Sequence, residues 1–499
     1  MLLRTCSIAV LLLGAASSAH AKLTCADVLK ALSKDLVDAT CFVSADLTTN
    51  NEQTTPPDNP FPDLSFTPRT DRTVISPNPP FRTAIKKAVP GLQVQARIAG
   101  DPTGQARFLL RLPNDWNGRL VVAGASGTRS EFNGDFAWSD YVVQKGYAYA
   151  SQNKGVLNLR FSASTDPLAC RLNPDSPVFV HFFDNDDGQP FTRWAQFMIR
   201  AGEIARDGVK AAYGPPPRYT YAVGTSNGGY QVRRAIEEAP QVFDGGIDWE
   251  GTFVDPHAPN LLTDLPPAVL NFPDYRNSGF DAGSTAAKNI VAAGYPPDIK
   301  SDLSTPTVPS TTLWDRNWVQ FWEVTLCQWQ KRLDPTYETY VSGTGTYNYI
   351  HRLSVSNVGA EVAAFQNTGK IRRPLITVAG TMDSLLPIDH HARAYARKVE
   401  AAGGKNKRDD DDDRDRHDKG PAYRLYEVQN GNHIENYKQL NFSKLEFIQP
   451  HAQRSFDLLV DHVERGASLP PSQCIARGGS ISDTPAPGQA GHCANFFVP

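Results

Sequence analysis

The stretch that decides the fold runs from residue 219 to residue 229 and reads YTYAVGTSNGG. An apolar run ends at Gly224, and a helical pattern then continues to about Ala239. This order predicts a buried strand, a sharp turn that carries Ser226, and a helix. Glycines two residues before and two residues after the serine avoid side-chain clashes where the backbone turns. The G-x-S-x-G motif therefore predicts a serine whose oxygen projects at the carboxyl edge of a sheet, at the positive end of a helix.

A serine hydroxyl is a weak nucleophile, so the motif predicts a partner base that is oriented by an acid. In a site built on such a turn, the acid and then the base follow the serine along the chain. Asp383 lies just beyond the apolar run 374–380, and His433 lies in the loop after the strand pattern 423–428. We therefore predict a catalytic triad of Ser226, His433 and Asp383.

Other residues of the same types leave alternatives open. Asp248 is a rival acid, because it lies in the strand pattern that follows the nucleophile helix. His390, His391 and His451 are rival bases, although they lie in helical patterns. A plain glycine-rich turn, a loop carboxylate and a surface histidine are the non-catalytic interpretations of the three predicted residues.

Strand patterns alternate with helical patterns on both sides of the serine motif. Strands are predicted at 94–98, 108–112, 120–123 and 147–151, and the clearest helix is predicted at about 191–213. Such alternation is typical of a mostly parallel α/β sheet flanked by helices. Between about 253 and 371 the pattern changes to proline-rich loops and helices, which indicates an insertion over one end of the sheet.

With these motifs in this order, the chain resembles the α/β-hydrolase superfamily of serine esterases. The resemblance implies an α/β-hydrolase fold with a large inserted lid domain, and a reaction that needs neither a cofactor nor a metal. It also implies an oxyanion hole made of the backbone N–H groups of Asn227 and Ala125. Small residues at 124–127 would let such donors approach closely, although a plain glycine-rich turn is the alternative there.

Within the superfamily, the chain is similar to the tannase and feruloyl esterase family of secreted hydrolases. The large insertion and the run KGYAYAS at 145–151 carry this likeness. The Ser-Asn-Gly-Gly turn is also similar to that of secreted polyhydroxyalkanoate depolymerases and oligomer hydrolases. The first likeness implies phenolic or hydroxycinnamate esters, which are the first choice of substrate. The second implies a 3-hydroxyalkanoate polyester or oligomer, which is the second choice. A peptidase and a non-catalytic binding module with a hydrolase fold are the remaining alternatives.

Two pairs of residues are candidates for the substrate pocket. Trp249 and Glu250 end a strand pattern and should lie near the pocket mouth. Trp314 and Trp318 share a helical face in the insertion and could stack on an aromatic acyl group. A packed core of the insertion is the favoured interpretation of these last two.

The cysteines indicate an exported chain held by disulfides. One of the seven lies in the predicted leader, and an even number of cysteines in an exported chain is typical of disulfide bonds. Proximity in the sequence favours Cys25–Cys41 and Cys474–Cys493, which leaves Cys170–Cys327. We therefore expect a secreted or periplasmic protein.

The pattern changes along the chain predict its domain organisation. The first residues have a basic start, an apolar run and a small-residue cleavage pattern, as signal peptides have. We expect a signal peptide at 1–21, an N-terminal extension at 22–82, a catalytic domain at 83–252 and 372–470, a lid at 253–371, a charged and disordered insertion at 403–420, and a disulfide-tied tail at 471–499.

The composition argues against several kinds of partner. Of 499 residues, 40% are hydrophobic and 21% are charged, which is ordinary for a globular protein. The formal net charge is -3 and no basic stripe is present, so we expect no nucleic-acid binding. No stretch after the leader is apolar enough to span a bilayer, so we expect no membrane association once the leader is cleaved. The sequence leaves the oligomeric state open.

No metal site is expected from the sequence. The chain has no CxxC pair and no Cys/His cluster at zinc spacing. The acidic runs at 184–188 and 409–413 contain carboxylates that could bind Ca²⁺. A helix cap and a solvated segment are their favoured interpretations.

Overall fold

The computed structural model describes residues 24–54, 81–127, 130–156, 160–181, 190–303, 311–337, 346–403 and 421–499. The predicted signal peptide, both acidic runs and nearly all of the predicted charged insertion lie outside the described residues. Within the described residues, no helix combines the length and the apolar character that crossing a membrane requires.

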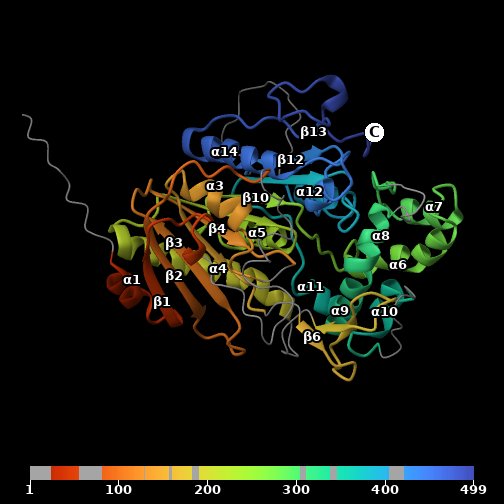
Figure 1. The fold of residues 1–499 in the computed structure, drawn as a ribbon, viewed down its shortest axis with the longest axis horizontal. Coiled ribbons are helices and arrows are strands. Elements are labelled where there is room, and N and C mark those ends of the chain that lie inside the picture. Colours follow the sequence, from red (N-terminus) through yellow and green to blue (C-terminus); the bar gives the residue numbers. More distant parts are fainter. Residues whose placement is uncertain are drawn as a thin grey trace, which may run out of the picture.

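Ten strands form one mixed sheet, in the order β1-β2-β3-β5-β4-β9-β10-β11-β12-β13 (Figure 1). Its antiparallel end consists of β1 (Leu36–Ser44), β2 (Gly91–Ile98) and β3 (Arg107–Pro113), and β3 pairs antiparallel with β5 (Ala148–Gln152). From β5 to the opposite edge of the sheet, each strand pairs in parallel with the next. These strands are β4 (Arg119–Gly124), β9 (Tyr219–Thr225), β10 (Gly245–Trp249), β11 (Leu375–Gly380), β12 (Tyr423–Val428) and β13 (Gln473–Ile475). The mostly parallel sheet predicted from the sequence is therefore confirmed.

Helices cover both faces of the sheet, because the strands alternate apolar side chains toward each face. In β4, Leu120 and Val122 belong to one core, whereas Val121 and Ala123 belong to the other. The first core is completed by α1 (Cys25–Leu32), α4 (Pro190–Tyr213), α5 (Asn227–Glu238) and α12 (Ala392–Ala401). The second is completed by the π-helical turn Asp135–Ser139, α3 (Asp140–Val143) and α14 (Gln449–Arg465).

Two segments that were expected to lie outside the catalytic domain contribute strands to its sheet. Residues 36–44, which we assigned to an N-terminal extension, form β1 at the antiparallel edge. Residues 473–475, which we assigned to the tail, form β13 at the opposite edge. A small separate sheet, in the order β6-β8-β7, was not predicted; its strands are β6 (Arg160–Ser162), β7 (Cys170–Arg171) and β8 (Phe179–His181).

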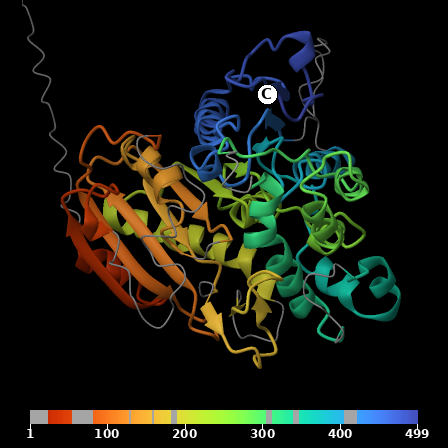
Figure 2. The ribbon, with the colours of Figure 1, turned by 45° about the vertical axis from the view of Figure 1, so that its right-hand side comes forward.

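The described part of 253–371 is a block of helices at one end of the sheet, coloured green to teal in Figure 2 and away from the antiparallel strands. Its members are α6 (Leu261–Asn277), α7 (Thr285–Ala292), α8 (Leu313–Asn317), the π-helical turn Trp318–Trp322, α9 (Glu323–Leu333), α10 (Tyr349–Val355) and α11 (Val358–Ala363). The short helix α13 (Asn436–Gln439) and the 3₁₀ turns Glu52–Thr54 and Pro487–Gln489 complete the assigned helices.

The tryptophan row of the insertion lies in its core. Trp314 and Trp318 are each 1% exposed. Trp318 stacks on Phe272 with a centroid separation of 4.9 Å, and Trp314 meets Tyr275 edge-on at 5.1 Å. This is the packed arrangement that the sequence favoured for these residues over a place in the substrate pocket.

All three predicted disulfides are present. Cys25–Cys41, Cys170–Cys327 and Cys474–Cys493 have Cα separations of 5.5, 6.0 and 4.8 Å. The second joins strand β7 to helix α9, so it links the small sheet to the helical block across 157 residues of chain. A disulfide that closes a longer loop removes more conformational entropy from the unfolded chain, so this one should restrict the unfolded chain more than the other two.

Candidate active site

Ser226 lies on the sharp turn between β9 and α5 that the motif predicts. Its backbone has φ 60° and ψ −123°, a region that non-glycine residues rarely adopt and that costs on the order of 1–3 kcal/mol. Its N–H donates to the carbonyl of Trp249 at 3.0 Å, and its own carbonyl accepts from the N–H of Thr252 at 3.2 Å. These two hydrogen bonds, to residues at the end of the neighbouring strand β10 (Gly245–Trp249) and just after it, thus hold the strained turn in place.

The glycines of the motif are required by close backbone packing. A Cβ added to Gly224 would lie 2.4 Å from the carbonyl carbon of Gly228. A Cβ added to Gly228 would lie 2.7 Å from the carbonyl oxygen of Gly124, at the end of β4. The start of α5 therefore packs directly against the backbone of two strands, and this fixes where Ser226 lies above the sheet edge.

We expect Gly224→Ala to lower the free energy of unfolding by about 1–3 kcal/mol, because its Cβ would overlap backbone atoms that cannot rotate away. Gly488→Ala is the matched control, because a Cβ there meets no atom within 4 Å. Urea unfolding of both variants measures the difference. Equal unfolding midpoints for the two variants would contradict this account of the motif.

The predicted acid and base are in direct contact. The Nδ1 of His433 lies 2.8 Å from the Oδ2 of Asp383, and both residues are buried. Asp383 follows β11 and His433 follows β12, so two parallel neighbours bring the pair together at one sheet edge. The other oxygen of Asp383 accepts the N–H groups of Leu385 and Leu386 at 2.8 and 2.7 Å, which fixes the carboxylate toward the ring.

The charges around His433 favour its protonated form. Burial lowers the pKa of His433, but the carboxyl groups of Asp383 and Glu250 outweigh this effect and raise the pKa to about 9. The imidazole is therefore stabilised as a cation, which is the state that a base reaches after it accepts a proton.

The rival acid makes different contacts. Asp248 is buried in β10, the strand next to β11. Its Oδ2 lies 2.6 Å from the Nε of Arg233 in α5. The same oxygen accepts from the hydroxyl of Thr377 at 2.7 Å, and Oδ1 accepts from the N–H of Gly251 at 2.8 Å. Asp248 thus joins α5, β10 and β11.

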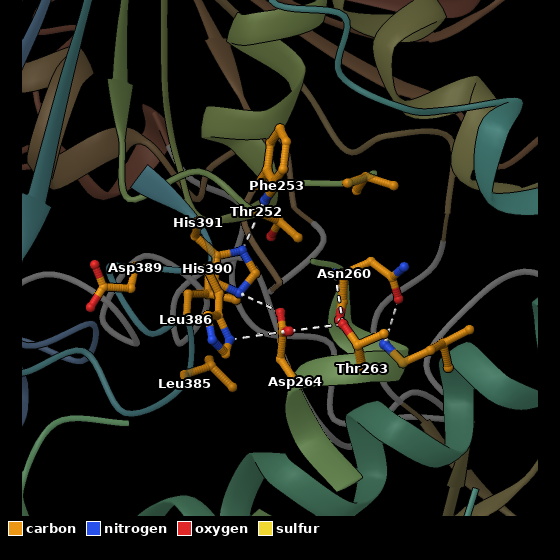
Figure 3. A network of polar contacts seen from close by, with 12 residues as sticks. Thr252, Phe253, Asn260, Thr263, Asp264, Leu385, Leu386, Asp389, His390 and His391 are labelled. Carbon is orange, nitrogen blue, oxygen red and sulfur yellow. Dashed lines mark hydrogen bonds and ion pairs between the residues drawn. The ribbon is translucent and has the colours of Figure 1, made fainter. Parts of the chain in front are cut away.

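Two of the rival bases lie in a cluster around Asp264, shown in Figure 3. The Nδ1 of His390 lies 3.1 Å from one carboxylate oxygen of Asp264, and the Nε2 of His391 lies 3.4 Å from the other. The Nδ1 of His391 accepts the N–H of Phe253 at 2.9 Å. Because Asp264 belongs to α6, this cluster ties the helical block to the chain that follows Asp383 (Figure 3). The third rival, His451, lies in α14, and burial lowers its pKa to about 4.

The predicted oxyanion donors differ in what they bind. Asn227 is the first residue of α5, where a backbone N–H has no acceptor within the helix. The N–H of Ala125, in contrast, donates to the side-chain oxygen of Gln231 at 2.9 Å. The N–H of Ser126 likewise donates to Asn133, at 3.2 Å. In this structure the N–H of Ala125 thus already has an acceptor, and its role as an oxyanion donor stays a prediction.

Trp249 and Glu250, the two pocket candidates at the end of β10, have side chains in different surroundings. Trp249 is fully buried in the core on the α14 face of the sheet, edge-on to Trp138 at 6.3 Å. The side chain of Trp249 is therefore part of this core. One carboxyl oxygen of Glu250 lies within 4.8 Å of ligand atoms of Asp383 and His433. Sequence reasoning gave Glu250 no role beside the acid and the base.

The strand order, the helices on both faces and the serine turn define an α/β-hydrolase fold, as predicted. A family model for 3HB-oligomer hydrolase matches residues 308–495. D-(-)-3-hydroxybutyrate oligomer hydrolases of Burkholderia thailandensis and Burkholderia mallei are 30% and 29% identical over 135 residues. That stretch is 26% of this chain and 17% of each relative, so the chain matches about a sixth of the length of these curated relatives. The expected resemblance to oligomer hydrolases is confirmed.

Two solved structures with names of ester hydrolases align with most of the chain. Feruloyl esterase B from Aspergillus oryzae aligns with a TM-score of 0.48 and 11% identity, covering 90% of this chain and 91% of its own. Tannin acyl hydrolase from Aspergillus niger aligns with a TM-score of 0.45 and 14% identity, covering 90% and 88%.

Proposed function

We propose that the chain is a serine ester hydrolase that uses Ser226, His433 and Asp383. The contact between His433 and Asp383, at the sheet edge next to a strained serine turn, is the observation that carries this proposal. Ser226 bonds to Trp249 through its N–H, and the residue after Trp249 approaches both members of the pair. This connection supports a serine that neighbours the imidazole.

The proposed reaction is acyl transfer through the serine oxygen. His433 takes the hydroxyl proton of Ser226 while the oxygen attacks the ester carbonyl, and then gives that proton to the leaving alcohol. Water, deprotonated by the same imidazole, hydrolyses the acyl-enzyme and regenerates the serine. Asp383 holds the ring in the required orientation, and the N–H of Asn227 is the proposed donor to the oxyanion.

The proposed substrate is an oligomer of a 3-hydroxyalkanoic acid. The family match and the curated relatives, which are named as 3-hydroxybutyrate oligomer hydrolases, support this choice. Phenolic esters, which the sequence analysis placed first, are the comparison substrates. We also propose that residues 253–371 act as a lid, which is consistent with the bond from the indole N–H of Trp322 to the carbonyl of Ser384 at 2.7 Å.

The test is a substrate panel with the purified chain. We expect turnover of 3-hydroxybutyrate trimer to exceed that of methyl ferulate and methyl gallate, with no cleavage of peptide anilides. A fluorophosphonate probe should label the protein at Ser226. Faster turnover of the phenolic esters would overturn the substrate class, and a protein that neither reacts with the probe nor cleaves any ester would overturn the function.

The rate of ester hydrolysis is expected to rise with pH toward about 9. His433 must be neutral to accept the serine proton, and neighbouring carboxyl groups raise its pKa to about 9. Below that pH the ring is protonated, so kcat/KM should fall about tenfold per pH unit. A pH profile of kcat/KM between pH 5 and 10 checks this, and a flat profile above pH 6 would contradict it.

We further propose that the protein is exported with its leader removed. The three disulfides support this, because such bonds persist in oxidising compartments. Mass spectrometry of the protein from its natural compartment should find a chain that begins at Lys22. A cytoplasmic protein with reduced cysteines would contradict the proposal.

A further inference from the structure

Glu250 is a buried carboxyl group with no assigned task. It directly follows β10 and is 2% exposed. Within the described residues, neither of its carboxyl oxygens makes a hydrogen bond of good geometry, although the backbone of Gly380 approaches closely enough to favour the ionised form. An ionised carboxylate in that position would lack the bonds that normally compensate for lost water, so its protonation state depends on the groups close to it.

Three ionisable groups converge around this carboxyl. One ligand atom each from Glu250, Asp383 and His433 lies within 4.8 Å of the others. Two carboxyl groups this close cannot both ionise easily beside a neutral imidazole, because their charges repel at buried positions. Burial, above all, and the charges of Asp383 and Glu435 hold the pKa of Glu250 well above its usual range, and His433 opposes them.

The backbone is arranged to place this side chain there. Glu250 has φ 51°, in the left-handed region that favours glycine and disfavours a residue with a long side chain. Its N–H donates to the carbonyl of Val378 at 2.8 Å, which anchors the residue to β11, the strand that leads to Asp383. A strained backbone held beside a functional pair indicates that the side chain has a task there.

We propose that Glu250 is a second acid of the catalytic triad, a positioning residue that holds a proton while Asp383 carries the charge that orients His433. When Asp383 cannot carry that charge, Glu250 releases its proton and orients the imidazole in its place. The proposal rests on the esterase function above and adds a fourth residue to it. Asp383 and Glu250 then form one carboxyl pair that holds a single negative charge while His433 is neutral.

A double-mutant cycle with Asp383→Asn and Glu250→Gln tests this. Both substitutions keep the side-chain shape, and the Oδ1 of an asparagine can still accept the N–H groups of Leu385 and Leu386. Loss of a triad acid lowers kcat by about 10,000-fold where no substitute exists. We expect D383N to lose only about 100-fold, E250Q up to about tenfold, and the double variant about 10,000-fold, since residues that act as a unit are not additive.

The pH profile separates this role from a structural one. In D383N the ionised Glu250 faces His433. In D383N/E250Q both described carboxyl groups that raise the pKa of His433 are replaced by amides. Glu435 acts on residue 250, and burial lowers the pKa of the neighbouring His391, which keeps that ring neutral. A charge this close shifts the pKa of an imidazole by about one unit or more. The acidic limb of kcat/KM should therefore lie about one pH unit lower in the double variant than in D383N. Thermal unfolding shows whether each variant is folded.

The outcomes decide between the proposals. If E250Q reduces kcat/KM by the same factor with and without D383N, or if the acidic limb does not move between D383N and the double variant, Glu250 is not a second acid. A wild-type protein without esterase activity, or a fully active Ser226→Ala variant, overturns the proposed function instead.

Discussion

Replacing Ser226 with alanine is expected to lower kcat for ester hydrolysis by roughly 10⁴- to 10⁶-fold. The hydroxyl is the proposed nucleophile, so the variant retains only substrate binding and oxyanion stabilisation. The substitution removes one oxygen from a residue that is 7% exposed, and alanine can occupy the same strained turn. Hydrolysis of 3-hydroxybutyrate trimer and of p-nitrophenyl esters measures the loss, and labelling by a fluorophosphonate should disappear.

Ser354 provides a matched control, because replacing it with alanine removes a serine hydroxyl at a position outside the proposed site. Ser354 lies exposed in α10, where its hydroxyl donates only to the carbonyl of His351 at 2.8 Å. We expect Ser354→Ala to hydrolyse esters like the wild type and to react with the probe. Hydrolysis by Ser226→Ala at the wild-type rate, in a preparation free of other esterases, would refute the assignment of the nucleophile.

The serine turn was predictable because its requirements are local. Gly224 and Gly228 face each other across the turn, so a side chain at either position is excluded, and the strand before them is buried along nearly all of its length. The disulfides between near neighbours were equally accessible, since short loops bring cysteines together in any fold. Features of this kind depend on a few residues that are close together in the sequence, so the sequence alone can predict them.

The sequence favoured Asp383 over Asp248 as the acid, but it could not give the contacts that distinguish them, because both belong to neighbouring parallel strands or the loops that follow them. What separates them is long-range: Arg233 reaches Asp248 from α5, whereas His433 reaches Asp383 from the loop after β12. The engagement of Ala125 by Gln231 has the same cause, since 106 residues separate them. The strands β6 to β8 were missed because two or three residues carry no periodic pattern.

The position of Glu250 illustrates a third kind of limit. A strict alternation along β10 would send Trp249 and Glu250 to opposite faces of the sheet. The strand ends at Trp249, and the positive φ of Glu250 turns the chain so that the carboxyl meets Asp383 and His433. A non-glycine residue in that conformation is a tertiary feature, and no signal in the sequence marks it.

Asp248→Ala is expected to lower the free energy of unfolding by about 3–5 kcal/mol, because it leaves the guanidinium of Arg233 buried without its counter-charge. The carbonyl of Thr252 at 3.3 Å and the ring of Tyr395, 4.3 Å from the guanidinium carbon, cannot replace a carboxylate. A loss of this size is a large share of the 5–15 kcal/mol by which domains are typically stable. Urea unfolding measures it.

The same variant also tests whether Asp248 has any part in the chemistry. Asp274→Ala, at an exposed position of α6, is the control and should change the unfolding free energy by at most about 0.5 kcal/mol. If Asp248 only joins α5 to the sheet, the folded fraction of its alanine variant should hydrolyse esters at a rate close to that of the wild type. Wild-type stability together with a lost rate would show that Asp248, and not Asp383, is the acid that serves His433. Loss of the two carboxylates is thus expected to have opposite effects: loss of Asp248 lowers the stability, whereas loss of Asp383 lowers the rate of catalysis.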